Sequence, residues 1–375
     1  MSVPRLPPEV VDLVLSYLQT PHDSKTLKAS TLVCSEWFPI ARQHLFSVLN
    51  VREDGTPNCD SVHFLHVVRL SPGIRMAVKH LRIKGPSTSH AIPFDSLFTL
   101  LHELPHLQHL TLHRMMIPSH LGENLPQLSL RKLTLRYVSD EMDESRRCSS
   151  MFQFLDLFVV EQLNMLFILW YYPFMAPPRK TVSATPISST FKAFRVQASF
   201  SAAQCLEFLC FSPNLNAVTE LDIRIDSFNL LISLGSLVDE QGCAIRTLKL
   251  RFTEKLSVYE RHDWMDFQNI VQRHLQPPLH ALLSLKSFHL VATTLSNASP
   301  FWGVFPAFFR ALPTTLTEFH LCCASSPFPV EIPQFDQLIH GYPNLTDIYV
   351  HSPCGEAMEK DMRSSQSGKT FHCID

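Results

Sequence analysis

Residues 107–112 read LQHLTL and residues 130–135 read LRKLTL, and each stretch places apolar side chains at its first, fourth and sixth positions. Three further stretches share this spacing: IRTLKL at 245–250, LTEFHL at 316–321 and LTDIYV at 345–350. Apolar and polar residues that alternate over a few positions are typical of a β-strand with one buried face. We therefore expect a short strand at each of these copies.

The same spacing recurs along most of the chain, which indicates an internal repeat. Ten copies occur, and successive copies begin 23 to 40 residues apart. Their first positions are Val78, Leu107, Leu130, Val160, Phe191, Val218, Ile245, Leu285, Leu316 and Leu345. Most of these steps are typical of solenoids, in which each unit adds one short parallel strand and a returning helix or loop.

The repeat predicts an α/β fold, a solenoid of about ten units over residues 51–375. No unit can bury its apolar face alone, so neighbouring units must stack and share one core. Residues 94–101 and 264–271 show helical spacing between copies and are expected to return the chain. The clearest segments are expected to pair in chain order as one parallel sheet: residues 107–112, 130–135, 160–165, 218–223, 245–250, 316–321 and 345–350.

Residues 1–50 lack the repeat and have the pattern of three short helices. The first begins at Leu6-Pro7-Pro8-Glu9, because proline is tolerated in a first helical turn and a glutamate there complements the helix dipole. The second is expected over 24–33, and the third follows Ser35 as its N-cap, with Pro39 tilting or delaying it. One apolar stripe of the first helix comprises Val10, Leu13, Val14, Tyr17 and Leu18. Such small helices bury too little area to be robust alone, so a partner surface is expected.

These residues resemble the F-box family. Three short motifs follow one another in the order of an F-box over roughly residues 4–50. They are Leu6-Pro7-x-Glu9-Val10, then Tyr17-Leu18, then Leu32-Val33-Cys34-x-x-Trp37 with Ala41. The resemblance implies docking to the Skp-type adaptor of a cullin–RING ubiquitin ligase. The residues that it assigns to the adaptor contact are Leu6, Pro7, Glu9, Val10, Leu18, Leu32, Val33 and Trp37. The alternative is a plain three-helix cap that shields the first repeat, and the two roles are compatible.

The repeat array resembles the degenerate leucine-rich repeats that follow F-boxes in many fungal proteins. It departs from the standard repeat, because no asparagine or cysteine stands three residues after the last apolar position of any copy. Met115, Val138 and Thr253 are among the residues found there instead. A regular asparagine ladder between the strands is therefore not expected.

The composition excludes several classes of function. The 32 Lys+Arg against 34 Asp+Glu give a net charge of −2, so no overall field favours nucleic acid or an anionic membrane. Only ten glycines occur against 27 prolines, and the chain has no Walker A loop, dinucleotide-binding glycine motif, HExxH or GxSxG. We expect no enzymatic activity, no cofactor and no metal.

Cysteines and the first residues indicate the compartment. The ten cysteines form no C-x-x-C pair, and the N-terminus carries charges and consecutive prolines where a secretory signal needs an apolar run. We expect reduced thiols and a cytoplasmic or nuclear location, or both. Residues 162–178 hold no charge, but the run is short and contains Pro173, so a buried strand is expected rather than a membrane span.

A target-binding face follows from the alternation of side chains along each strand. Residues between the apolar positions are expected on the face opposite the core, the concave face of a solenoid. The first three strands place basic residues and no acid there, whereas later strands are mixed. The residues expected to bind the target are His80, Arg82, Lys84, His109, His113, Lys132 and Arg136. The alternative is ordinary variation of a solvated surface.

Several cations in one groove suit an acidic or phosphorylated segment, because arginine forks match carboxylate and phosphate oxygens. Such binding would weaken with salt, and it would strengthen below about pH 6.5 if the three histidines took part.

The sequence thus predicts the substrate-recognition subunit of a Skp–cullin–F-box type ubiquitin ligase. An interaction scaffold with the same solenoid but no ligase role is one alternative. A hydrolase is another, and it would require a serine or cysteine nucleophile with histidine and aspartate converging in a pocket.

Overall fold

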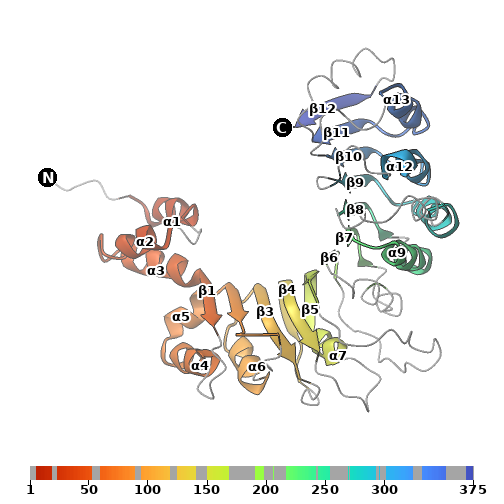
Figure 1. Cartoon of the computed structure of the whole chain (residues 1–375). Helices are drawn as coiled ribbons and strands as arrows, with labels where there is room; N and C mark the ends of the chain where they lie inside the picture. Colours follow the sequence, from red (N-terminus) through yellow and green to blue (C-terminus); the bar gives the residue numbers. More distant parts are fainter. Residues whose placement is uncertain are drawn as a thin grey trace. The chain divides into compact units, whose positions relative to one another are not determined.

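The computed structural model describes residues 6–18, 23–52, 60–88, 94–118, 125–140, 150–168, 191–197, 206, 217–241, 244–253, 269, 271–292, 295, 301–323, 332–351 and 369–374. These residues form two compact units, one up to Val160 and the other from Glu161 onward. Both units are α/β, and in each unit helices cover one face of the strands (Figure 1).

Twelve strands, counted over the described residues, follow one another in the sheet in their order along the chain. Each pair whose register is described is parallel. The predicted parallel sheet in chain order is confirmed, and the arrangement is solenoid-like. The strands of the first unit are β1 (Val48–Arg52), β2 (His80–Lys84), β3 (His109–Ile117), β4 (Leu128–Asp140) and the start of β5 (Phe158–Leu166). The second unit adds β6 (Ala193–Gln197), β7 (Glu220–Ile225), β8 (Thr247–Phe252), β9 (Ser287–Val291), β10 (Glu318–Cys322), β11 (Asp347–His351) and β12 (Thr370–Ile374).

The expected returning helices occur between strands. The helix expected at 94–101 is α6, whereas the one expected at 264–271 lies outside the described residues except for 269 and 271. The helices of the first unit are α1 (Pro8–Ser16), α2 (Ser24–Ser30), α3 (Trp37–Ser47), α4 (Asp60–Leu70), α5 (Pro72–Ala77), α6 (Phe94–His102) and α7 (Ser150–Asp156). The second unit has α9 (Phe228–Gln241), the π-helix η5 (Val271–Leu275), α11 (Gln276–His280), α12 (Phe301–Arg310) and α13 (Ile332–His340).

The prediction of ten strands missed the first and the last. β1 carries the spacing at Phe46, Leu49 and Val51, but the helical pattern that runs into Phe46 concealed it. β12 has its last two apolar positions at Phe371 and Cys373, but a glycine stands at the first position. The run at 162–178 begins inside β5, as expected, and its later part lies outside the described residues.

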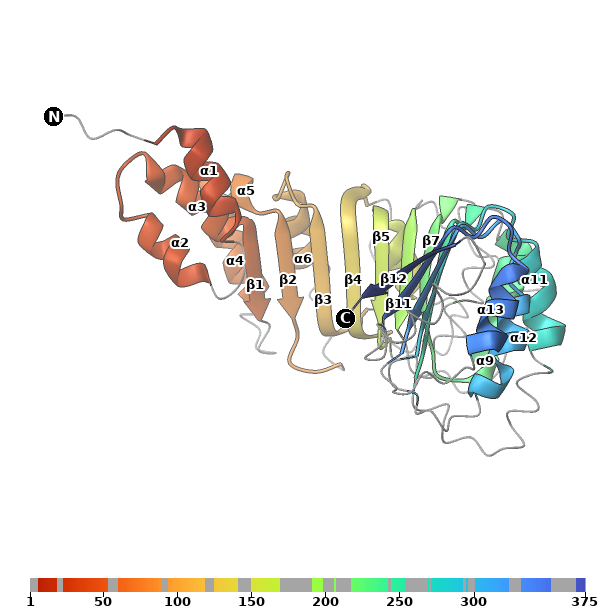
Figure 2. The same cartoon turned by 90° about the horizontal axis from the view of Figure 1, so that it is seen from above.

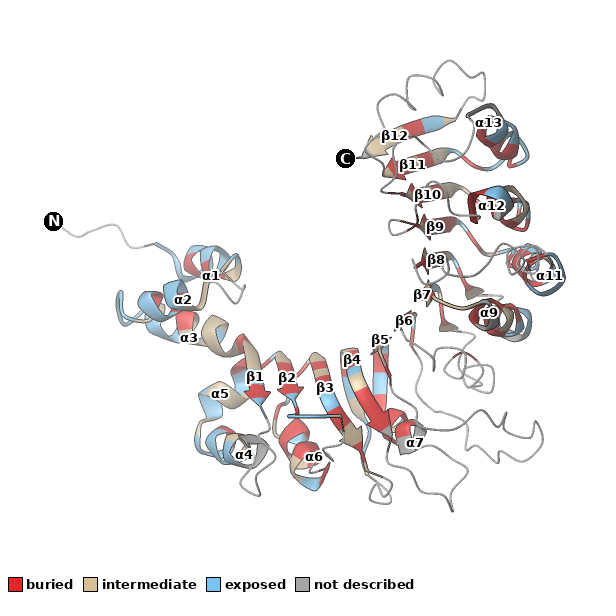
Figure 3. Cartoon of the chain, in the orientation of Figure 1, coloured by how far each residue is buried: buried red, intermediate tan, exposed pale blue. Residues whose placement is uncertain are grey.

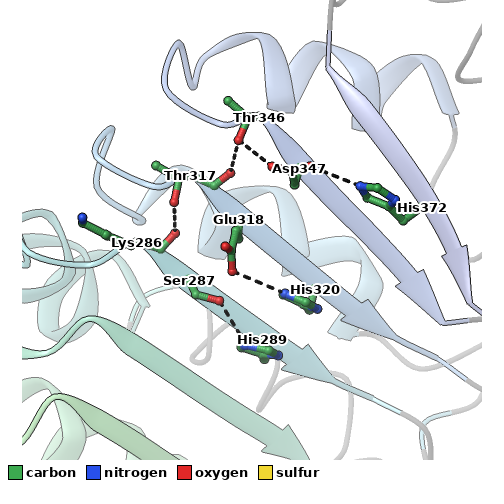
Figure 4. Close-up of polar contacts among 9 residues, drawn as sticks. All are labelled: Lys286, Ser287, His289, Thr317, Glu318, His320, Thr346, Asp347 and His372. Atoms are coloured by element: carbon green, nitrogen blue, oxygen red, sulfur yellow. Dashed lines mark hydrogen bonds and ion pairs between the residues drawn. The ribbon is translucent and has the colours of Figure 1, made fainter.

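A repeated backbone hydrogen bond holds the strands in register without an asparagine ladder. The amides of Thr317 and Glu318, at the start of β10, both donate to the carbonyl oxygen of Lys286, which precedes β9. The hydroxyl of Thr317 donates to the same oxygen at 3.0 Å, and the hydroxyl of Thr346 donates to the carbonyl oxygen of Thr317 at 3.2 Å (Figure 4). These bonds tie each strand to the one before it, so the strands stack without the missing asparagines.

The core lies between the strands and the helices, where buried positions face one another (Figure 3). In the second unit it includes a cluster of phenylalanine rings. Phe301, Phe305 and Phe309 recur every four residues of α12 and therefore share one face of that helix. The ring of Phe309 packs edge-on against Phe319 of β10 with centroids 4.9 Å apart, and Phe335 of α13 closes the cluster.

Three helices precede β1 and lie at the N-terminal end of the first unit (Figure 2). The second helix ends at Ser30, earlier than the expected Val33. The prediction that Ser35 caps the third helix is wrong, because the helix begins at Trp37, one residue later than a cap at Ser35 requires. Glu36 occupies the N-cap without a side-chain cap bond. Pro39 falls in the first turn, where its missing amide costs nothing, and the helix continues unbroken.

Candidate functional site

The three N-terminal helices enclose a small core. It consists of Val11 and Leu15 from α1, Leu27 from α2 and Ala41 from α3, all buried. Four half-buried side chains pack around them, namely Leu18, Trp37, Ile40 and Leu45. This core is small because most of the apolar stripe expected on the first helix does not contribute to it.

Most of that stripe faces outward instead. Val10, Leu13, Val14 and Tyr17 are exposed, with Tyr17 at 77%, and only Leu18 packs against the core. Large apolar side chains before α1, after α2 and in α3 are exposed as well. We call the set the apolar docking surface, and its members are Leu6, Val10, Leu13, Val14, Tyr17, Leu32, Val33 and Phe38. Monomeric proteins seldom expose such a group of large apolar residues, and its presence marks an interaction site.

The residues assigned to the adaptor contact divide into two groups. Trp37 and Leu18 are half-buried and pack against the core, so each also supports the helices themselves. The other six are exposed, and Leu32 reaches 85%. These six are Leu6, Pro7, Glu9, Val10, Leu32 and Val33.

The residues assigned to the target lie together on neighbouring strands of the first unit. They occupy the face opposite the buried Leu81, Leu110 and Leu133, which we call the open face. The backbone register places them in three rows. The rows are His80, His109 and Lys132; Arg82, Thr111 and Thr134; and Lys84, His113 and Arg136.

Among the described residues, no carboxylate neutralises the cations of this open face. Arg82, Lys84, Lys132 and Arg136 form no ion pair within the described part of the chain. Like charges on adjacent strands repel each other, so this face has a positive potential that an external anion would relieve.

The histidines of the open face have lowered pKa values, which makes them harder to protonate than free imidazoles. The imidazoles of His80 and His109 lie against each other with ring centroids 4.1 Å apart. Burial, followed by the charges of His80, Lys132 and Arg131, lowers the pKa of His109 to about 4. Burial and neighbouring cations also lower the pKa of His80 and of His113. Binding through protonated histidines below pH 6.5 is therefore not supported, because the cations beside the rings oppose protonation.

A left-handed kink at the same position of β3 and β4, which we call the bulge, adds two residues to this face that the sequence analysis missed. Arg114 and Tyr137 have φ angles of 55° and 52°, in the left-handed region. They occupy equivalent positions, directly after His113 and Arg136, which pair with each other. The left-handed residue lets two successive side chains stand between buried positions, so simple alternation fails there. One signal in the sequence could have indicated this kink. An apolar residue, Met115 in β3, stands at the position where a standard repeat has asparagine.

In the second unit one acidic residue of the open face is paired with two arginines of the neighbouring strands. The carboxylate of Asp222 accepts two hydrogen bonds from the guanidinium of Arg251, at 2.8 and 2.9 Å, and lies 3.4 Å from that of Arg195. These strongly paired groups leave little net charge for a ligand.

Further along, four rings stack in a row across neighbouring strands. His289, His320, Tyr349 and His372 follow one another with centroid distances of 3.9, 4.2 and 4.5 Å. Their edges carry polar contacts: Nε2 of His372 lies 3.1 Å from the carboxylate of Asp347 (Figure 4). Burial, then the neighbouring His320 and Lys249, lowers the pKa of His289 to about 4. Ser287, expected on this face, is buried and bonds to His289.

None of the family models and none of the curated proteins compared with the chain matches it. Among the described helices, none is both long enough and apolar enough to cross a membrane. In the same ranges, no three histidine, cysteine or acidic side chains are grouped so that they could hold a metal ion. The assignment of function rests on the two surfaces described above.

Proposed function

We propose that the protein is the substrate receptor of a Skp–cullin–F-box type ubiquitin ligase. Its N-terminal helices would dock on the Skp-type adaptor, and the open face of its sheet would hold the target. Ubiquitin transfer itself would be performed by other subunits of the ligase.

The apolar docking surface is the observation that carries this proposal. Six of the eight residues that resemble the adaptor contact of an F-box are exposed, although four of those six are large and apolar. Burying such side chains on a partner stabilises a complex by about 1.5–3 kcal/mol each, before the costs of association. A helical cap that only shielded the first strand would not need to display Leu32 or Tyr17 to solvent.

The test is co-purification of a Skp-type adaptor with the full chain. Leu32→Ser combined with Val33→Ser removes two exposed apolar contacts from the turn after α2 and leaves the helical core intact. We expect adaptor recovery to fall about tenfold or more, because central apolar anchors at interfaces typically contribute about 2 kcal/mol. Trp37 is less suitable for substitution, because it also packs against the core.

The matched control is Leu70→Ser combined with Leu283→Ser. Both leucines are as exposed as the docking residues, at 71% and 73%, but lie outside the three N-terminal helices. This variant should retain the adaptor. Equal recovery from both folded variants and the parent would rule out docking through this surface.

A further inference from the structure

The bulge on β3 and β4 gathers charges that the docking surface does not use. The backbone register places Lys84 of β2, His113 of β3 and Arg136 of β4 side by side on the open face. The left-handed residues Arg114 and Tyr137 come directly after the last two. Three cations therefore surround one imidazole ring on three neighbouring strands. We call these five residues the bulge cluster.

The contacts within the bulge cluster show that its members lie close together. The ring of Tyr137 lies 5.7 Å from that of His113, between centroids, and the guanidinium carbon of Arg136 lies 5.5 Å from the centroid of Tyr137. Burial lowers the pKa of His113, and the charges of Arg136, Arg114 and Lys84 lower it further, in that order. All three cations thus lie near the same imidazole ring, that of His113.

No described carboxylate balances these charges. Arg114 and Arg136 are exposed, and neither forms an ion pair among the described residues, in contrast to Arg251 of the second unit, which is held by Asp222. The Nε2 atom of His113 is buried and has no hydrogen-bond partner in the part of the chain that the structure describes. A polar atom in that state costs free energy unless something binds it.

We propose that the bulge cluster is a binding site for a phosphate group, carried by a phosphorylated side chain of the target protein. The identity of the ligand as part of a target rests on the proposed function, whereas the site itself does not.

Phosphate fits this site better than a lone carboxylate does. It carries close to two negative charges near pH 7 and three oxygens, which suits two arginines and a lysine. The ring of Tyr137 under Arg136 restrains that guanidinium before the ligand arrives and so reduces the entropy lost on binding. A membrane lipid is disfavoured, because no large apolar side chain is exposed among the described residues of β2, β3 and β4.

The experiment uses the full chain and labelled libraries of short peptides with phosphoserine, serine or aspartate at the central position, compared by fluorescence anisotropy at low ionic strength. We expect the phosphoserine library to bind about tenfold more tightly than the serine library, and inorganic phosphate to compete with it. Arg114→Asn combined with Arg136→Gln should abolish this difference. Lys84→Gln, an exposed change in a regular strand, provides a second variant should the first not fold.

The matched control is Lys79→Gln combined with Arg131→Gln. It removes the same charge from the same unit, at exposed residues near the opposite ends of β2 and β4, and should preserve the preference for phosphoserine. Equal binding of all three libraries by the parent, or an unchanged preference in the cluster variant, would overturn the proposal. So would cluster-dependent binding of anionic vesicles or single-stranded RNA in place of the peptides.

Adaptor recovery, measured on the same proteins, separates this proposal from the proposed function. The cluster variant should retain the adaptor. If the parent binds phosphopeptides through the bulge cluster but binds no adaptor, the phosphate site stands and the ligase role fails.

Discussion

Left-handed backbone at Arg114 and Tyr137 shapes the bulge cluster, and it has an energetic cost. A residue with a Cβ in this region is disfavoured by about 1–2 kcal/mol. Strain of this kind is typical of functional sites. Alternation along a strand predicted that Lys84, His113 and Arg136 would share a face, but no two-residue period can predict the residue that interrupts it.

Replacing Arg114 should therefore separate stability from binding. Asparagine tolerates left-handed backbone better than arginine does, so Arg114→Asn should leave the free energy of unfolding unchanged or raise it by up to about 1 kcal/mol. Phosphopeptide affinity should fall at the same time. The control is Arg82→Asn in the regular strand β2, where asparagine is disfavoured and stability should drop. Chemical denaturation measures the free energy of unfolding of both variants. A loss of stability in Arg114→Asn but not in Arg82→Asn would contradict this interpretation.

The lowered pKa of His109 makes a further prediction at the residue scale. In the unfolded chain this imidazole titrates near 6.5, and in the folded protein near 4, so the unfolded state binds more protons between these values. The contribution of His109 to stability is complete above pH 6.5 and is lost as the pH falls toward 4. Denaturation at pH 7 and pH 5 should show a smaller loss for His109→Gln than for the parent.

The matched control for this titration is His106→Gln, which removes an exposed imidazole from the same unit. It should lose as much stability on acidification as the parent does. If His109→Gln does the same, the neutral state inferred for the stacked histidines is wrong.

At the scale of elements, the strands were predictable because each repeats one apolar spacing, and the parallel order followed from the length of the repeat. The missed strands show the limits of that reasoning. β1 overlaps a helical pattern, and a strand that continues directly from a helix gives no turn residue to mark it. The helix boundaries were harder to predict than the strands. Local hydrogen bonds, such as that from the amide of Phe38 to the carbonyl oxygen of Cys34, occur at helix ends, and no cap motif in the sequence reveals them.

Two helical glycines test the packing of the second unit in opposite directions. A Cβ on Gly235 of α9 would clash with the carbonyl oxygen of His274, so Gly235→Ala must displace η5 from α9. We expect a loss of about 1–3 kcal/mol in the free energy of unfolding. Gly303 of α12 has nothing within 4 Å, so Gly303→Ala should gain about 0.5–1 kcal/mol from helix propensity alone. Denaturation curves that move in the same direction for both would refute this packing.

At the scale of the whole molecule, the chain combines surfaces of different chemistry. The apolar docking surface and the bulge cluster both lie in the first unit, whereas in the second unit Arg195 and Arg251 of the open face are paired with Asp222. Local patterns in the sequence indicated part of each surface, but they missed Arg114 and Tyr137 of the bulge cluster. The division of charge between paired and unpaired groups was not predictable, because it depends on which strands become neighbours and in which register.

The most direct test of the central claim is calorimetry of the full chain with a purified Skp-type adaptor. Docking through an apolar surface predicts a dissociation constant of about 1 µM or tighter, a negative heat-capacity change and little dependence on salt. Leu32→Ser with Val33→Ser should weaken this binding, and the bulge-cluster variant should not. Absence of binding by the folded parent, or binding that disappears with salt while surviving the loss of Leu32 and Val33, would contradict the account.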